Sequence, residues 1–168
     1  TTFDDDAANR RTQTTDALVN NSQFTYDANG NLLTEVNPLG HVTTYTYDAM
    51  NRRIEVTDAL QNKTITTYDE VGRVIATTDA NGEITAFAYD DGNNLVQVTD
   101  AAGGVVDHTY DENGNRLTTT DPNGNITSHV YDALNRLTQK TEPLGHVSDY
   151  TFDAVGNLTE RTDANGQT

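Results

Sequence analysis

Aspartate is the residue whose number and spacing most invite a chemical interpretation of this chain. Asp and Glu together number 26 of the 168 residues, and two carboxylates in unlike environments can perform acid–base catalysis. The Asp residues recur at the same places of a repeating unit, however, whereas a catalytic pair would be a local exception to the repeat. We therefore interpret them as turn residues, and we predict no catalytic residues and no enzyme activity.

Histidines and acidic turns are the candidate metal ligands. His108 and His129 fall at equivalent places of successive units, so on neighbouring hairpins they would lie roughly 9 to 10 Å apart, too far for one ion to bridge. His41 and His146 fall in turns and are expected at the surface. Turns of the type Asp-x-Asn-Gly resemble calcium loops only superficially, because the same residues are the commonest turn formers. Since the chain also has no cysteine, we predict no metal site and no cofactor.

The repeating unit is marked by an aromatic residue followed by Asp every 21 residues, and the chain length of 168 equals 8 × 21. We predict that residues 1–168 form a single array of eight units and are a fragment of a larger protein. The first unit is degenerate, with Asp5 in the aromatic position, and its first residues are expected to fray. The predicted structural repeat positions are Tyr26, Asp27, Tyr47, Asp48, Tyr68, Asp69, Tyr89, Asp90, Tyr110, Asp111, Tyr131, Asp132, Phe152 and Asp153.

Charge and hydropathy exclude several classes of function. The formal net charge is −16 and the pI is near 4.2, which opposes binding to a phosphate backbone or to an anionic membrane surface. The sequence contains no apolar run long enough to cross a bilayer, and no signal peptide is visible. We predict no nucleic-acid partner and no membrane insertion.

Two clusters of turn formers alternate with two runs of β-favouring residues in each unit. The first cluster follows the aromatic-Asp pair, as in residues 27–31, and the second has the same chemistry, as in residues 79–82. Runs such as residues 42–47 are rich in Val, Thr and Tyr. The pattern predicts an all-β fold of tandem 21-residue β-hairpins in a twisted, coiling sheet, with essentially no helix. A solenoid with one coil per 21 residues stays an alternative.

Alternation along the second strand of each unit predicts two different faces. One face carries the repeat aromatics and, two residues earlier, a second and mostly aromatic column. The opposite face carries Val, Ile and Thr. Because neither face is cleanly apolar, we expect both to be partly wet. The aromatic columns either pack to stabilise the sheet or stand exposed to bind sugar rings, and packing is the stronger interpretation. The second column is Phe3, Phe24, Tyr45, Thr66, Phe87, His108, His129 and Tyr150.

Segments such as 47–52, 68–74 and 131–137, each opening on Tyr-Asp, resemble the Rhs or YD repeat over almost the whole chain. This family includes bacterial Rhs polymorphic toxins, the shells of insecticidal toxin complexes, wall-associated proteins and teneurins. The resemblance implies a spiralling strip of hairpins that builds a hollow shell around a C-terminal toxin. The family's protease-like plug is not present, because Asp121-Pro122 opens an ordinary turn.

The resemblance implies a noncatalytic structural segment of a shell that encapsulates a toxin in a large secreted bacterial protein. Its partners would be the rest of the parent chain and the enclosed toxin, with an export signal outside this segment. A cell-surface adhesion or carbohydrate-binding array is the alternative, with a glycan as partner. Open sheet edges further predict a monomer or a weak edge-to-edge dimer.

Overall fold

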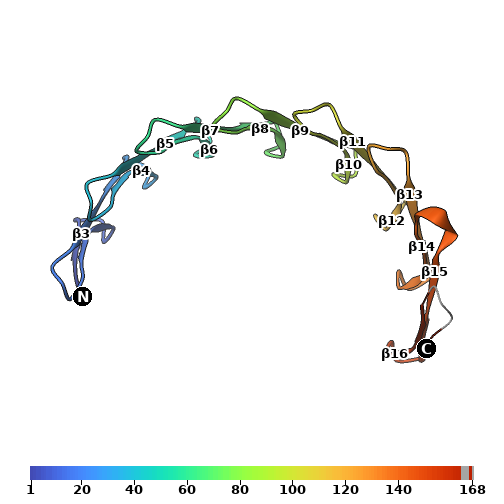
Figure 1. The fold of residues 1–168 in the computed structure, drawn as a ribbon. Helices are drawn as coiled ribbons and strands as arrows, with labels where there is room; N and C mark the ends of the chain where they lie inside the picture. The colour runs from blue at the N-terminus through green and yellow to red at the C-terminus, as the bar shows by residue number, and fades with distance from the viewer. Residues whose placement is uncertain (164–166, 168) are drawn as a thin grey trace. The chain divides into compact units, whose positions relative to one another are not determined.

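The computed structural model describes residues 1–163 and 167 of this protein (Figure 1). The chain divides into two compact units, Thr1–Ile84 and Thr85–Thr168. The strands are β1 (Thr2–Asp5), β2 (Arg11–Thr15), β3 (Asn21–Tyr26), β4 (Leu32–Val36), β5 (Val42–Tyr47), β6 (Arg53–Thr57), β7 (Lys63–Tyr68), β8 (Val74–Thr78), β9 (Ile84–Tyr89), β10 (Leu95–Thr99), β11 (Val105–Tyr110), β12 (Arg116–Thr120), β13 (Ile126–Tyr131), β14 (Leu137–Thr141), β15 (Val147–Phe152) and β16 (Leu158–Thr162).

Each unit is a meander of antiparallel strands. In the first unit, β1 to β8 pair with their neighbours in chain order. In the second unit, β9 to β16 do the same, and Figure 1 shows the hairpins following one another. The all-β prediction is confirmed. The solenoid alternative is wrong, because its coils would pair parallel strands.

Two kinds of turn alternate along the chain and leave strands of five and six residues between them in each complete repeat. The YD turns join an odd strand to the following even strand, and the second turns join an even strand to the following odd strand. The YD turns are residues 6–10, 27–31, 48–52, 69–73, 90–94, 111–115, 132–136 and 153–157. The second turns whose residues are all described are 16–20, 37–41, 58–62, 79–83, 100–104, 121–125 and 142–146.

Both kinds of turn close in the same way. In the YD turn 27–31, the amide of Gly30 donates to the Asp27 carbonyl at 3.2 Å, and the Asp27 amide donates to the Asn31 carbonyl at 2.9 Å. The fourth residue has a positive φ, 92° at Gly30, which Gly adopts without strain. The second turns repeat both bonds, and there Val19 and Gln61 take the positive φ, at 66° and 69°.

A β-bulge follows every YD turn and explains the paired apolar residues of the even strands. Tyr26 pairs with Leu32 and Thr25 pairs with Thr34, so Leu33 is the extra residue on its strand. The same shift of one residue recurs in the other YD hairpins. Because a bulge interrupts the period of two, adjacent Leu residues can occupy one strand without placing one of them on the wrong face.

The described part of the chain has no closed apolar core. Among the described residues, only Thr57 is buried, with 8 % of its surface exposed. Alternation is clear in β5, where Tyr45 and Tyr47 are half-buried while Val42, Thr44 and Thr46 on the other face are exposed. The expectation that both faces are partly wet is therefore confirmed, and the aromatic face is the more covered one.

One local expectation needs correction, at the chain start. The expectation of essentially no helix is confirmed, since the described residues contain only a three-residue 3-10 turn, η1 (Pro143–Gly145). Pro143 fixes its own φ, and Leu144 and Gly145 both have positive φ, at 76° and 82°. Glu142 opens this turn without a side-chain cap. At the chain start, the residues expected to fray form β1, which pairs with β2.

Candidate functional site: the row of YD turns

The carboxylate of each YD turn organises its own loop. The side-chain oxygens of Asp27 accept bonds from the amides of Asn29 at 2.9 Å and Asn31 at 2.8 Å, and from Nδ2 of Asn31 at 2.8 Å. The side-chain bond from Asn31 and the backbone bonds hold the pKa of Asp27 below its ordinary value, against the opposing effect of burial. Asp suits this position because its short side chain reaches the backbone two residues on.

The fifth residue of the YD turn is either Asn or Arg, and both bond back to the turn carboxylate. Arg52 donates from Nε to Oδ2 of Asp48 at 2.7 Å, and Arg73 and Arg136 repeat the contact with their own Asp at 2.6 Å each. The backbone bond from Arg52, its side-chain bond and its charge all lower the pKa of Asp48. Asp and Arg thus form a neutral pair at the edge of the sheet.

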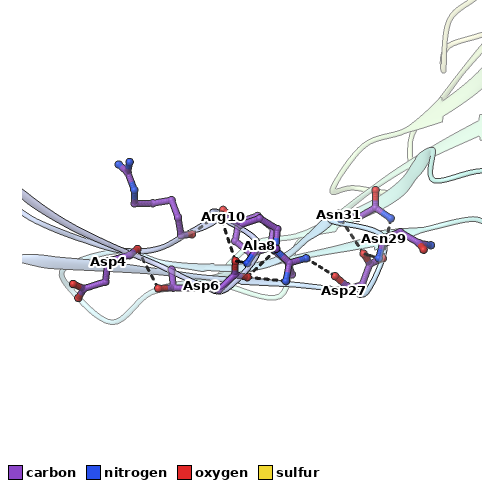
Figure 2. Close-up of polar contacts among 10 residues, drawn as sticks. Asp4, Asp6, Ala8, Arg10, Asp27, Asn29 and Asn31 are labelled. Carbon is purple, nitrogen blue, oxygen red and sulfur yellow. Dashed lines mark hydrogen bonds and ion pairs between the residues drawn. The ribbon is translucent and has the colours of Figure 1, made fainter.

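The same arginines extend to the next YD turn. Nη1 of Arg10 donates to the carbonyl of Asp27 at 2.7 Å, 17 residues along the chain, as Figure 2 shows. Arg52 reaches the Asp69 carbonyl at 2.9 Å in the same manner. Arg136 reaches the Asp153 carbonyl at 3.2 Å.

Each of these guanidinium groups also lies over the aromatic ring of the next repeat. The Cζ atoms of Arg10 and Arg52 stand 5.0 and 4.7 Å from the ring centroids of Tyr26 and Tyr68, within the range of cation–π attraction. Arg136 stands 4.7 Å from the ring of Phe152. One arginine therefore holds both members of the next aromatic-Asp pair.

Where the fifth residue is Asn, amide bonds join the turns instead. Nδ2 of Asn31 donates to Oδ1 of Asn51 at 2.7 Å, and Asn29 contacts the same oxygen at 3.0 Å. Nδ2 of Asn115 donates to Oδ1 of Asn135 at 2.7 Å. The acceptor is the positive-φ Asn of the following turn. Within each unit, neighbouring YD turns are thus linked by the guanidinium of Arg10, Arg52 or Arg136, or by the amide of Asn31 or Asn115.

The repeat tyrosines add a third contact between repeats. The hydroxyl of Tyr26 donates to the Arg11 carbonyl at 2.8 Å, and the hydroxyl of Tyr47 donates to the Leu32 carbonyl at 2.9 Å. Tyr68, Tyr110 and Tyr131 donate to carbonyls 15 residues earlier in the same way. Each ring spans the open end of a second-turn hairpin and ties its two strands together.

In each unit, the predicted repeat positions lie where an odd strand meets its YD turn, and all fourteen are half-buried. The prediction did not include the fifth turn residue, although its signal was present as a column of Arg or Asn every 21 residues. The column consists of Arg10, Asn31, Arg52, Arg73, Asn94, Asn115, Arg136 and Asn157.

The hydrogen-bond partners of His41 and His108 are not carboxylates. His108 Nδ1 is 3.0 Å from the hydroxyl of Thr119, and His41 Nδ1 is 3.4 Å from Nδ2 of Asn37. Over the described part of the chain, no three His, Asp or Glu side chains gather where they could hold a metal ion. None of the helical structure described for this chain is long and apolar enough to span a membrane.

The 21-residue period with its linked turns matches a known repeat. The RHS Repeat family model matches residues 26–63, 68–105, 90–126 and 131–168. The chain belongs to the RHS repeat family. Comparison with curated proteins found no match.

Solved structures share the fold of these RHS repeats. The crystal structure of TcdB2-TccC3-Cdc42 superposes with a TM-score of 0.70 at 19 % identity, over 88 % of this chain and 9 % of that one. TcdB2-TccC3 gives 0.67 at 19 % identity, over 88 % and 10 %. The Photorhabdus luminescens Tc holotoxin pore gives 0.50 at 16 % identity, over 93 % and 12 %. This RHS array thus spans about a tenth of the length of these chains.

The RHS array is a structural repeat segment. Its repeat-defining aromatic and Asp residues make contacts that join one repeat to another or close a turn, through ring hydroxyls, turn carboxylates and backbone carbonyls. The sequence signature of the family and the contacts along the YD row therefore involve the same side chains.

Proposed function

We propose that this RHS array is a noncatalytic wall segment of a shell that encloses a C-terminal toxin in a large secreted bacterial protein. The observation that carries the proposal is the linked row of YD turns, since it joins hairpins into a strip without a closed core. A wall one sheet thick needs such side-chain links, because no second layer packs against it within either unit.

The structural neighbours support this role. They include TcdB2-TccC3-Cdc42 and a Tc holotoxin pore, and this array has the fold of about a tenth of those chains. The passenger of the present protein would be a toxin domain of its own parent chain, following the array and plug.

The face opposite the aromatics suits the lining or covering of a chamber. Its side chains bond to one another: the hydroxyls of Thr25 and Thr34 lie 2.6 Å apart, and Gln97 donates to Asp107 at 2.8 Å. Exposed apolar residues such as Ile84 and Ile126 lie among these polar side chains. A surface of this kind offers few continuous apolar contacts to a passenger.

The state of the aromatic rings favours a shell over a glycan-binding array. The rings of Tyr26 and Tyr68 are half-buried and lie beneath Arg10 and Arg52, and their hydroxyls are engaged with backbone carbonyls. A sugar-stacking ring needs a free face. The charge of −16 further favours a partner other than nucleic acid, and it opposes all but weak edge-to-edge pairing of two copies.

Protease protection in the full-length parent protein tests the enclosure. The segment that follows the array should resist digestion in the intact protein. It should become digestible in an R52A/R136A variant, which lacks the arginine bonds to the Asp69 and Asp153 carbonyls. The H41Q variant, altered at an exposed turn, serves as the matched control and should keep the protection. Rapid digestion of the C-terminal segment in the intact protein would contradict enclosure, and oligosaccharide binding by this array in calorimetry would support the adhesion alternative.

A further inference from the structure

Two histidines replace aromatic residues of the second column in the second unit. His108 lies on β11 and His129 on β13, at the places that Phe24 and Phe87 occupy in other repeats. His108 contacts the Tyr110 ring edge-on at 6.5 Å between centroids and lies 3.0 Å from the Thr119 hydroxyl. These imidazoles are thus packed parts of the aromatic face, unlike His41 and His146, which are exposed.

The two ring nitrogens of His129 lie in different surroundings. Its ring hydrogen-bonds to the backbone of Leu117, whereas its Nδ1 atom is buried and has no partner in the structure. Protonation would place a charged N–H at that buried atom. A buried donor without an acceptor is costly, and a charged one more so.

The charged groups around the two rings are mostly cations. The neighbouring strands contribute Arg116 from β12 and Lys140 from β14, while β10 has no titratable residue. Lys140 is paired with Glu142 at 2.7 Å. Asp107, beside His108 on β11, is the one carboxylate that favours its charged form.

We propose that His108 and His129 form an acid-sensitive point in the second unit, at which protonation of the two rings loosens the packing of β11 to β14 while the first unit stays folded. Two positive charges would arise beside Arg116 and Lys140, in an otherwise strongly acidic molecule. The proposal rests on these contacts alone and holds whether or not the array encloses a toxin.

The direction of the pH dependence follows from the folded state. Burial, and then the charge of Arg116, lower the pKa of both rings below 6.5, with Lys140 adding to the effect at His129. The unfolded chain therefore takes up these protons at higher pH than the folded chain. The stabilising contribution is complete above about pH 6.5 and is lost as pH falls through the lowered pKa values. The turn carboxylates titrate in a separate, more acidic range.

Hydrogen exchange of this 168-residue chain tests the proposal, with rates corrected for the intrinsic effect of pH. Between about pH 7.5 and about pH 5.5, protection of β11 to β14 should fall severalfold more than protection of β3 to β6. The double variant H108F/H129F, which restores aromatic residues to the column, should abolish the difference, and the matched control H41Q should keep it.

Titration of the imidazole resonances by NMR provides a second measurement that does not depend on any variant folding. The midpoint of His129 should lie below 6.5, the ordinary pKa of histidine. A midpoint at or above 6.5, or an equal loss of protection in both units, would overturn the proposal.

Discussion

The two edges of the array use the same turn and differ in what the last turn residue contacts. On the YD edge, Arg52 bonds to its own Asp48 and then reaches the Asp69 carbonyl of the next turn. On the other edge, the amide of Asn62 donates to Asp58 of its own turn at 2.9 Å, and Asn125 does the same with Asp121 at 2.8 Å. Side-chain links between repeats thus concentrate on the YD edge.

This difference explains where the sequence is regular and where it varies. The YD edge repeats an aromatic residue, Asp and Arg or Asn with little change. The fifth residue of the second turns varies more, and is Asn62, Glu83, Gly104 or His146 in different repeats. The third residue is exposed in both kinds of turn, at 82 % for Leu60 and 73 % for Val71. Because the side chains of a second turn bond within their own turn, its residues need only be compatible with the backbone conformation of that turn.

The largest effect is expected from removing a repeat aromatic. Y68A deletes a half-buried ring, its hydroxyl bond to the Arg53 carbonyl and its contact with Arg52, so it should lower the free energy of unfolding by about 2 kcal/mol. The matched variant on the other edge, L60A, should change it by less than about 0.5 kcal/mol, because Leu60 is exposed. Urea unfolding measures both, and equal losses would refute the contrast between the edges.

A smaller loss is expected from cutting one arginine link. R52A removes the bond to Asp69 and the cation–π contact with Tyr68, and should cost about 1 to 1.5 kcal/mol. N62A on the second edge should cost less, since the amide it removes serves one turn. R52K should recover only part of the loss, because an ammonium group cannot reproduce the planar guanidinium contacts. Full recovery by Lys in thermal unfolding would contradict the geometry described for Arg52.

A gain in stability is expected where the second edge carries backbone strain. Val19 has a φ of 66°, a region that β-branched residues avoid. V19G should therefore raise the free energy of unfolding by about 0.5 to 1 kcal/mol. G82V, the reverse change at the equivalent place of another repeat, should lower it. An unchanged melting temperature in both variants would show that backbone strain does not govern these turns.

The two edges are expected to differ least in how their turn carboxylates make the stability depend on acidic pH. The side-chain bonds from Asn31 and Asn62 are the leading causes that lower the pKa of Asp27 and Asp58. Because the folded pKa values lie below the unfolded ones, this stabilisation is complete above about pH 4 and is lost as pH falls through the lowered values. D27N and D58N should flatten the pH dependence of the urea midpoint to a similar degree. Flattening by only one of them would contradict the equal role given to the two turn carboxylates.

The sequence predicted the elements of this fold well, because its signals are local. Asp and Gly or Asn at fixed places predict the turns, and runs such as 42–47 predict the strands between them. The bulge at Leu33 was not predictable from alternation, since an extra residue breaks the period on which alternation depends. The link from Arg52 to Tyr68 and Asp69 was also not predicted, because such a prediction requires knowing that turns 21 residues apart lie side by side. Positive φ at Val19 contradicts its intrinsic preference, and only the 21-residue period indicates it, by aligning Val19 with Gly40 and Gly82.

The central claim is that side chains on the YD edge couple one repeat to the next, and a double-mutant cycle on Arg52 and Tyr68 tests it most directly. The account predicts a coupling energy of about 0.5 to 1 kcal/mol between R52A and Y68A in urea unfolding. The matched cycle on the second edge, N62A with N81A, should be additive. Additivity in both cycles would contradict the account, because the contact of Arg52 with the next repeat would then contribute nothing to the fold.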